Sequence, residues 1–264
     1  MSADSYRPLV FAHRGGADAL PEHTLGAYLR ALDDGADGLE CDVRLTRDGH
    51  LVCVHDRRLE RTSNGRGLVS AKTLAELDAL NYGSWHPGYP ADEELPDLSR
   101  LLTLDRLLDA VLSCGRQVRL LIETKHPSRY GAEVERRLVR TLRHFGLAEP
   151  KPDDRVQVTV MSFAALALRR IRAQAPALPR VYLMEFVPPG AGRGRLPFGA
   201  GTAGPGVDLI RARPALLPAV QAAGHQAYVW TVNTAADLEL VLAHRVDGVI
   251  TDRPRFVLDQ LDRM

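Results

Sequence analysis

Three acidic side chains lie in apolar stretches at positions that would let them bind one metal ion. Glu40 and Asp42 are two residues apart, so in a β-strand both would lie on the same face. Glu123 ends another apolar stretch and would add a third carboxylate. Converging carboxylates repel one another unless a cation lies between them, and an all-oxygen ligand set suits Mg2+ or Ca2+. The alternative for the first two is ordinary solvated charge near a strand end.

A second group of residues has the chemistry to bind phosphate and transfer protons. His13, Arg14, Gly15 and Gly16 follow an apolar stretch directly. The arginine offers a planar fork for two phosphate oxygens, and the glycine N–H groups can face an anion. His13 and His55 could serve as general base and general acid, because imidazole titrates near neutral pH. A lone histidine is more often structural, but two beside an arginine and a carboxylate cluster favour catalysis.

Five other residues follow predicted strands and have weaker assignments. Lys125 would share a strand face with the third carboxylate, where its charge could bind phosphate or stabilise the acidic groups. Trp230 could stack on a ligand or simply pack at the barrel mouth. Ser162 and Asn233 are candidate hydrogen-bond partners, and Asp252 could equally cap the final helix.

Short apolar strands alternate with amphipathic helices along the chain, which is typical of parallel α/β proteins. The predicted strands are 9–12, 38–45, 50–55, 118–123, 156–161, 181–184, 207–210, 226–232 and 249–251. The predicted helices are 24–33, 74–80, 103–113, 131–145, 164–174, 214–223, 235–243 and 254–261. About eight strand–helix units favour a closed (β/α)8 TIM barrel, whose active site lies at the C-terminal ends of the strands.

Two segments interrupt this alternation. Residues 56–101 are rich in glycine and proline and predict an insertion after the second barrel strand region. Residues 188–205 have a similar composition and predict a mobile loop. With no linker visible, we expect residues 1–264 to form a single domain.

Charge and composition limit the partners that the protein would bind. Lys plus Arg number 34 and Asp plus Glu number 33, so a net charge of +1 gives no reason to expect nucleic acid as a partner. Cys41, Cys53 and Cys114 lack the spacing of a zinc site or a disulfide framework, and the first two should be buried free thiols. Residues 1–8 show no signal peptide, and no apolar run predicts a membrane span, so we expect a cytoplasmic protein. The oligomeric state stays open.

Seven motifs, in this order and spacing, resemble the glycerophosphodiester phosphodiesterase family over nearly the whole chain. They are AHRGG (12–16), PEHT (21–24), GLECDVRLTRDGHLVCVHD (38–56), LLIETK (120–125), MSF (161–163), VWTVN (229–233) and DGVITDRP (247–254). One departure is His23, where the family usually has asparagine, and this departure changes the hydrogen bonding expected near Glu22.

The resemblance implies a TIM barrel with a small insertion that hydrolyses small glycerophosphodiesters, such as glycerophosphocholine, to an alcohol and sn-glycerol 3-phosphate with Ca2+ or Mg2+. By position it implies two catalytic histidines, a phosphate-binding arginine, three metal-binding carboxylates and two pocket residues, namely His13 and His55, Arg14, Glu40, Asp42 and Glu123, and Lys125 and Trp230. The nucleophile, either the glycerol hydroxyl or water, and the assignment of base and acid stay open, as does the preferred headgroup.

The residues leave three alternative functions to consider. A phosphodiesterase for lysophospholipids or another headgroup would need an apolar rim, for which Tyr82, Trp85 and Tyr89 supply aromatic surface. A catalytically silent binding protein would need a lost ligand or histidine, and none of the main positions is missing. A metal-free sugar-phosphate isomerase barrel is disfavoured by the clustered carboxylates.

Overall fold

The computed structural model describes residues 6–89 and 95–263. Residues 1–5, part of the N-terminal segment in which no signal peptide was predicted, lie outside the described part. The same holds for residues 90–94, part of the predicted insertion, and for residue 264.

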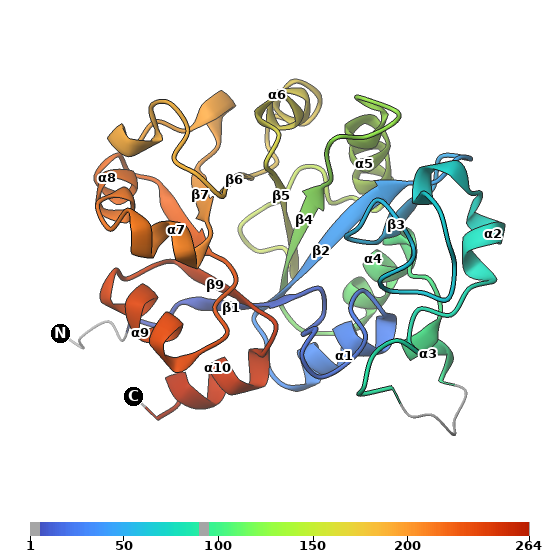
Figure 1. Ribbon diagram of the computed structural model, residues 1–264. Coiled ribbons are helices and arrows are strands. Elements are labelled where there is room, and N and C mark those ends of the chain that lie inside the picture. Colours follow the sequence, from blue (N-terminus) through green and yellow to red (C-terminus); the bar gives the residue numbers. More distant parts are fainter. Residues whose placement is uncertain (1–5, 90–94, 264) are drawn as a thin grey trace.

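Within the described residues, eight parallel strands close into a barrel, which confirms the predicted (β/α)8 fold (Figure 1). Around the barrel these are β1 (Leu9–His13), β2 (Gly38–Leu45), β4 (Val118–Thr124), β5 (Val156–Ser162), β6 (Arg180–Met184), β7 (Thr202–Pro205), β8 (Gln226–Val229) and β9 (Gly248–Thr251). Closure comes from β1, which pairs with both β2 and β9. The remaining strand, β3 (Leu51–Cys53), pairs antiparallel with β2 outside the barrel and is shorter than predicted.

The helices surround the strands, as Figure 1 shows. They are α1 (Leu25–Asp33), α4 (Leu104–Ser113), α5 (Glu133–His144), α6 (Ala165–Gln174), α7 (Val207–Ala212), α8 (Leu216–Ala222), α9 (Ala235–Ala243) and α10 (Pro254–Leu261). Threonine hydroxyls accept hydrogen bonds from backbone N–H groups at the starts of α1, α4 and α9, where an intrahelical partner is missing.

Successive side chains of β2 point to opposite faces of the strand, and each face belongs to a different layer of the core. Leu39, Cys41 and Val43 point outward and pack among helix residues such as Leu104 and Leu107. The opposite face points into the barrel, where a separate apolar cluster packs in the interior, formed by Phe11, Leu121, Met161, Val181, Leu183, Tyr228 and Ile250. The acidic residues of β2 therefore lie on the interior face.

The segment between β3 and α4 holds η1 (Val69–Ala71), α2 (Leu74–Asp78) and α3 (Pro96–Ser99). Its apolar side chains pack in a small cluster of their own that includes Leu59, Leu77 and Tyr82. The helix predicted at 74–80 is present but shorter.

The strand predicted at 207–210 is wrong, because these residues begin α7. The sixth barrel strand is instead β7, inside the stretch predicted as a mobile loop, which also contains η2 (Ala191–Arg193) and η3 (Pro197–Gly199). A Cβ at Gly204 would lie 2.7 Å from Leu183 Cδ2 and 2.8 Å from Val181 Cγ1. Packing thus requires glycine at this position of β7, and glycine carries no strand signal in the sequence.

None of the described helices is both long and apolar enough to span a membrane.

Gly38 offers a test of packing at the base of the barrel. A Cβ there would collide with the Arg119 carbonyl oxygen and lie 2.7 Å from Phe11 Cδ1. We expect Gly38→Ala to lower the free energy of unfolding by about 3 kcal/mol, measured by urea denaturation. The control is Gly201→Ala, where a Cβ meets nothing within 4 Å and the change should stay below about 0.5 kcal/mol. Equal stability of the two variants would contradict this account.

Candidate active site

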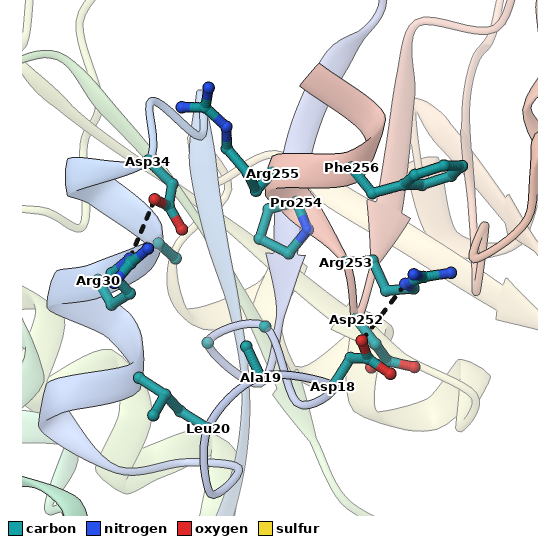
Figure 2. A pocket seen from close by; sticks show the side chains of 13 residues that line it. Asp18, Ala19, Leu20, Arg30, Asp34, Asp252, Arg253, Pro254, Arg255 and Phe256 are labelled. Carbon is teal, nitrogen blue, oxygen red and sulfur yellow. Dashed lines mark hydrogen bonds and ion pairs between the residues drawn. The ribbon is translucent and has the colours of Figure 1, made fainter. Parts of the chain in front are cut away.

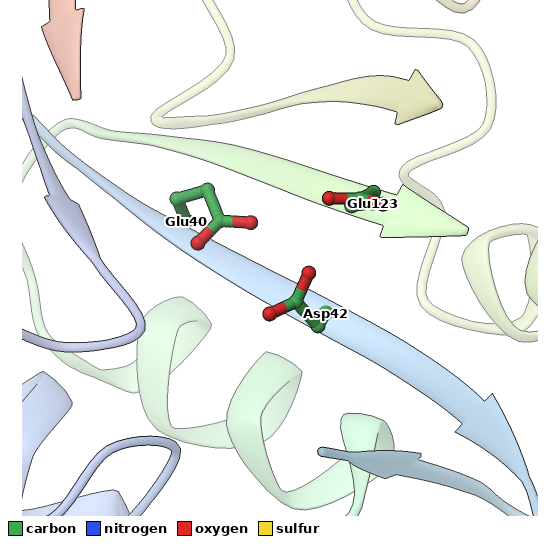
Figure 3. Close-up of side chains that lie close together, drawn as sticks. All are labelled: Glu40, Asp42 and Glu123. Carbon is green, nitrogen blue, oxygen red and sulfur yellow. The ribbon is translucent and has the colours of Figure 1, made fainter. Parts of the chain in front are cut away.

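Glu40, Asp42 and Glu123 converge on one point inside the barrel. One oxygen from each lies within 4.8 Å of the others, and all three side chains are buried. The two residues of β2 share a face, and the β2–β4 register places Asp42 beside Glu123. Figure 3 shows the three carboxylates turned toward one another from these neighbouring strands.

Burial and mutual repulsion set the protonation of this cluster. Burial, together with the charges of Asp42 and Glu123, raises the pKa of Glu40 well above its usual value. Burial and the charge of Asp42 raise the pKa of Glu123 to about 8. Burial acts in the same direction on Asp42, but Lys125, His23 and Arg14 outweigh it and hold its pKa well below the usual value. Thus one carboxylate is stabilised as an anion and two are not.

Two cations stabilise the cluster from its sides. Lys125 Nζ lies 2.9 Å from Glu123 Oε1 and 3.3 Å from Asp42 Oδ1. Arg14 Nε lies 3.2 Å from Asp42 Oδ2 at ion-pair distance, without the angle of a hydrogen bond. Burial lowers the pKa of Lys125, but the two adjacent carboxylates outweigh it and raise the pKa overall.

The donor set fits a divalent cation. Three buried carboxylates converge, and burial together with the neighbouring carboxylate charges raises the pKa values of two of them, Glu40 and Glu123. A hard cation accepting oxygen ligands would supply compensating positive charge. These three carboxylates thus fit Mg2+ or Ca2+ as ligand types.

His13 is held by the carboxylate of Asp252, for which the sequence left a helix-capping role open. Its Nδ1 lies 2.6 Å from Asp252 Oδ1, and its Nε2 lies 3.9 Å from Glu40 Oε2. Asn233 Nδ2 donates to Asp252 Oδ2 at 2.7 Å, and Asn233 Oδ1 accepts from the Asp252 backbone N–H at 2.9 Å. An Asn–Asp–His chain therefore orients the ring, and the structure gives Asp252 no helix-capping bond at the start of α10.

His55 has a matching partner in the next residue. Its Nδ1 lies 2.7 Å from Asp56 Oδ1. Burial, with the charges of Arg14 and Lys125, lowers the pKa of His55 to about 4 despite the opposing effect of Asp42. Both histidines thus have Nδ1 occupied by a carboxylate, which leaves Nε2 as the ring nitrogen for proton transfer.

Arg61 is a residue that the sequence reasoning missed, and it ties the insertion to the site. Its guanidinium donates two hydrogen bonds of 2.7 Å to the carboxylate of Glu22 and one of 2.7 Å to Asp56. Glu22 also accepts a bond of 3.3 Å from Arg14. The only available signal was the position of Arg61 five residues after the His-Asp pair.

His23, the departure from the family pattern, contacts the carboxylate cluster from behind. Its Nε2 lies 3.0 Å from Asp42 Oδ2 and its Nδ1 lies 2.8 Å from the Tyr28 hydroxyl. Burial lowers its pKa. The expected change in hydrogen bonding therefore concerns Asp42, while Glu22 is bound by the two arginines.

A cavity of about 410 Å³ opens above the cluster and brings together most of the predicted site residues. Of the eight, seven line it, namely His13, Arg14, Glu40, His55, Glu123, Lys125 and Trp230. Asp42 lies behind, in contact with Arg14 and Lys125. Trp230 donates from Nε1 to the Gly204 carbonyl at 2.7 Å and packs edge-on against Phe163, so it both packs and faces the cavity.

Other candidates lie elsewhere. Ser162 is buried, donates to the Thr124 carbonyl at 3.0 Å and accepts from Ala164 N–H. Tyr82, Trp85 and Tyr89 do not line the cavity. Cys41 and Cys53 are buried free thiols, as predicted.

A smaller cavity of about 160 Å³ lies between α1 and α10 (Figure 2). Four of its charged residues pair with one another, Arg30 with Asp34 at 3.0 Å and Arg253 with Asp18 at 3.3 Å. These pairs leave the larger cavity as the better candidate for a phosphate-binding site.

The fold and the larger cavity together define a TIM-barrel enzyme with its polar site at the C-terminal ends of the strands. Residues 13–256 match the glycerophosphoryl diester phosphodiesterase family. The chain is 48% identical over 247 residues to "Probable glycerophosphodiester phosphodiesterase 1" of Mycobacterium tuberculosis, covering 94% of this chain and 90% of that protein. It is 31% identical to a glycerophosphodiester phosphodiesterase of Caldanaerobacter subterraneus, covering 96% and 97%.

Among solved structures, an Oleispira antarctica phosphodiesterase in complex with the product sn-glycerol-3-phosphate matches with a TM-score of 0.83 and 25% identity over 98% of both chains. The chain therefore belongs to the glycerophosphoryl diester phosphodiesterase family, and its enzyme class is that of the phosphodiester hydrolases.

Proton release should accompany divalent-cation binding. With a pKa of about 8, Glu123 is mostly protonated at pH 7 and must lose its proton to become a ligand. We therefore expect the apparent affinity for the divalent cation to rise from pH 6 to pH 8 and to level off above pH 8. Calorimetry at pH 7 in buffers of different ionisation enthalpy measures the protons released.

The matched control is Glu239→Gln, which removes an exposed carboxylate on α9 and should keep the wild-type pH slope. Glu123→Gln should flatten the dependence of cation affinity on pH and weaken cation binding. Cation binding without proton release at pH 7 would contradict the raised pKa.

Proposed function

We propose that this protein hydrolyses glycerophosphodiesters to an alcohol and sn-glycerol 3-phosphate, with a divalent cation and two histidines as general acid and base. The observation that carries the proposal is the convergence of Glu40, Asp42 and Glu123 next to a cavity that His13 and His55 also line. The Oleispira antarctica relative in complex with sn-glycerol-3-phosphate supports the product.

The three carboxylates would hold Mg2+ or Ca2+. When bound, the cation supplies positive charge that polarises the phosphate and stabilises the charge that develops during its transfer. Lys125 and Arg14 are already charged at the edges of this cluster and face the same cavity. They would bind the remaining phosphate oxygens and neutralise the charge that grows in the transition state.

His13 and His55 would transfer the protons. Asp252 and Asp56 accept hydrogen bonds at the two Nδ1 atoms, fix the ring orientations and stabilise each imidazolium as it forms. One ring would remove a proton from the nucleophile, either water, which gives sn-glycerol 3-phosphate directly, or a glycerol hydroxyl, which gives a cyclic phosphate that water then opens. The other would protonate the departing alcohol oxygen. Trp230 and Phe163 would form the apolar wall beside the glycerol or alcohol carbons.

The test of this function is an assay of metal-depleted protein with Mg2+, Ca2+ or Mn2+ added back, against glycerophosphodiesters and lysophospholipids. We expect chelation to abolish turnover, one or more of the cations to restore it, and sn-glycerol 3-phosphate to be released. Turnover of lysophospholipids alone would favour the alternative phosphodiesterase. Full activity in chelator would overturn metal assistance.

The Asp252 carboxylate provides a sharper test of the histidine assignment. Asparagine at this position would present an amide that cannot stabilise the imidazolium of His13, so we expect Asp252→Asn to lower kcat roughly 100-fold or more. His13→Ala should lower it at least as far. Steady-state kinetics, with circular dichroism to check folding, measures both.

The control for this pair is Asp259→Asn, which removes a carboxylate paired with Arg255 on α10, away from the cavity. It should leave kcat unchanged. Wild-type turnover in His13→Ala would rule out proton transfer by this residue.

A further inference from the structure

One wall of the cavity has no assigned role in the proposed chemistry. The loops that follow β4 and β6 contribute His126, Glu185 and Phe186 to its lining. This wall differs in charge from the part formed by Arg14 and Lys125. Both of those cations are paired with carboxylates of the cluster, Asp42 included.

Glu185 is an exposed carboxylate with no ion pair or hydrogen bond to any other residue in the described part of the chain. The side chain beside it, Phe186, is 70% exposed although it is a large apolar residue. An exposed aromatic ring next to an unpaired carboxylate gives a cation two favourable partners, the charge and the ring face. These two residues therefore stand out at the cavity mouth.

His126 adds an imidazole ring to the same wall. Its Nε2 lies 2.5 Å from Oε1 of Glu135, a carboxylate of α5 that is 0% exposed. Arg170 Nη1 lies 3.5 Å from the other oxygen of Glu135. Because Nε2 faces this carboxylate, Nδ1 is the ring nitrogen left to contact a ligand. The buried glutamate thus holds the ring in place.

We propose that this wall is the subsite for the alcohol half of the substrate and that it selects alcohols carrying a positively charged nitrogen. The inference rests on the proposed hydrolysis of glycerophosphodiesters. Glu185 supplies the charge, Phe186 supplies a ring face, and His126 lines the same wall. The cavity then has cations at the phosphate end and a carboxylate at the mouth, which complements a zwitterionic phosphodiester.

The same arrangement disfavours other headgroups. An acidic alcohol would bring like charge to Glu185, and a neutral alcohol would leave the carboxylate without a partner. The contribution should be modest because Glu185 is exposed to solvent and screened by salt. The preference for positively charged alcohols should therefore weaken as ionic strength rises.

The experiment compares two substrates of the same shape, glycerophosphocholine and its uncharged analogue with 3,3-dimethylbutanol in place of choline. The ratio of their kcat/KM values measures how much the positive charge of the alcohol contributes to selectivity. We expect wild-type protein to favour the choline ester by roughly three- to tenfold at low salt. Glu185→Gln should bring the ratio close to one, mainly by raising KM for the charged substrate.

Two further variants complete the test. Phe186→Leu keeps an apolar side chain without the ring and should reduce the ratio by part of the same amount. Glu239→Gln, the exposed control on α9, should keep the wild-type ratio. An unchanged ratio in Glu185→Gln would overturn the subsite while hydrolysis of both esters upholds the proposed function. Failure to hydrolyse either ester would instead refute the proposed function.

Discussion

Mutual repulsion among Glu40, Asp42 and Glu123 is the constraint on which the rest of the site depends. Three carboxylates buried within 4.8 Å of one another are unfavourable as anions, and the raised pKa values of Glu40 and Glu123 express that cost. Arg14 and Lys125 offset part of it through Asp42, the one carboxylate whose pKa is depressed. The barrel tolerates the arrangement because its parallel strands fix the backbone positions of all three residues, and a bound cation would complete the neutralisation.

The surrounding polar groups form layers that hold the inner residues in place. Asp252 and Asp56 each accept at the Nδ1 of a histidine, and Asn233 and Arg61 in turn bind these carboxylates. Such outer contacts fix ring orientation without touching the substrate, and their loss usually costs activity as well as order. Arg61 also connects the insertion to the site, because it binds Glu22, which in turn accepts a hydrogen bond from Arg14.

Much of the fold was predictable because strand and helix periodicity persists through the chain. Strand β2 and helices α9 and α10 agree with the predicted ranges, since their apolar positions alternate or recur at helical spacing. The sequence did not predict strand β7, and the reason is physical. Leu183 and Val181 fill the space over Gly204, so this position of β7 takes glycine, which gives no strand signal in the sequence.

The sequence by itself determined the alternation that makes the barrel and the residue types that carry chemistry. The spacing of Glu40 and Asp42 already placed both on one face of a strand, because side chains alternate along any β-strand. Only the tertiary structure decided which distant groups meet. The contacts of Asp252 with His13, of Arg61 with Glu22 and of Glu135 with His126 join residues between nine and 239 positions apart. Such pairs arise from barrel closure and loop packing, which local sequence patterns do not encode.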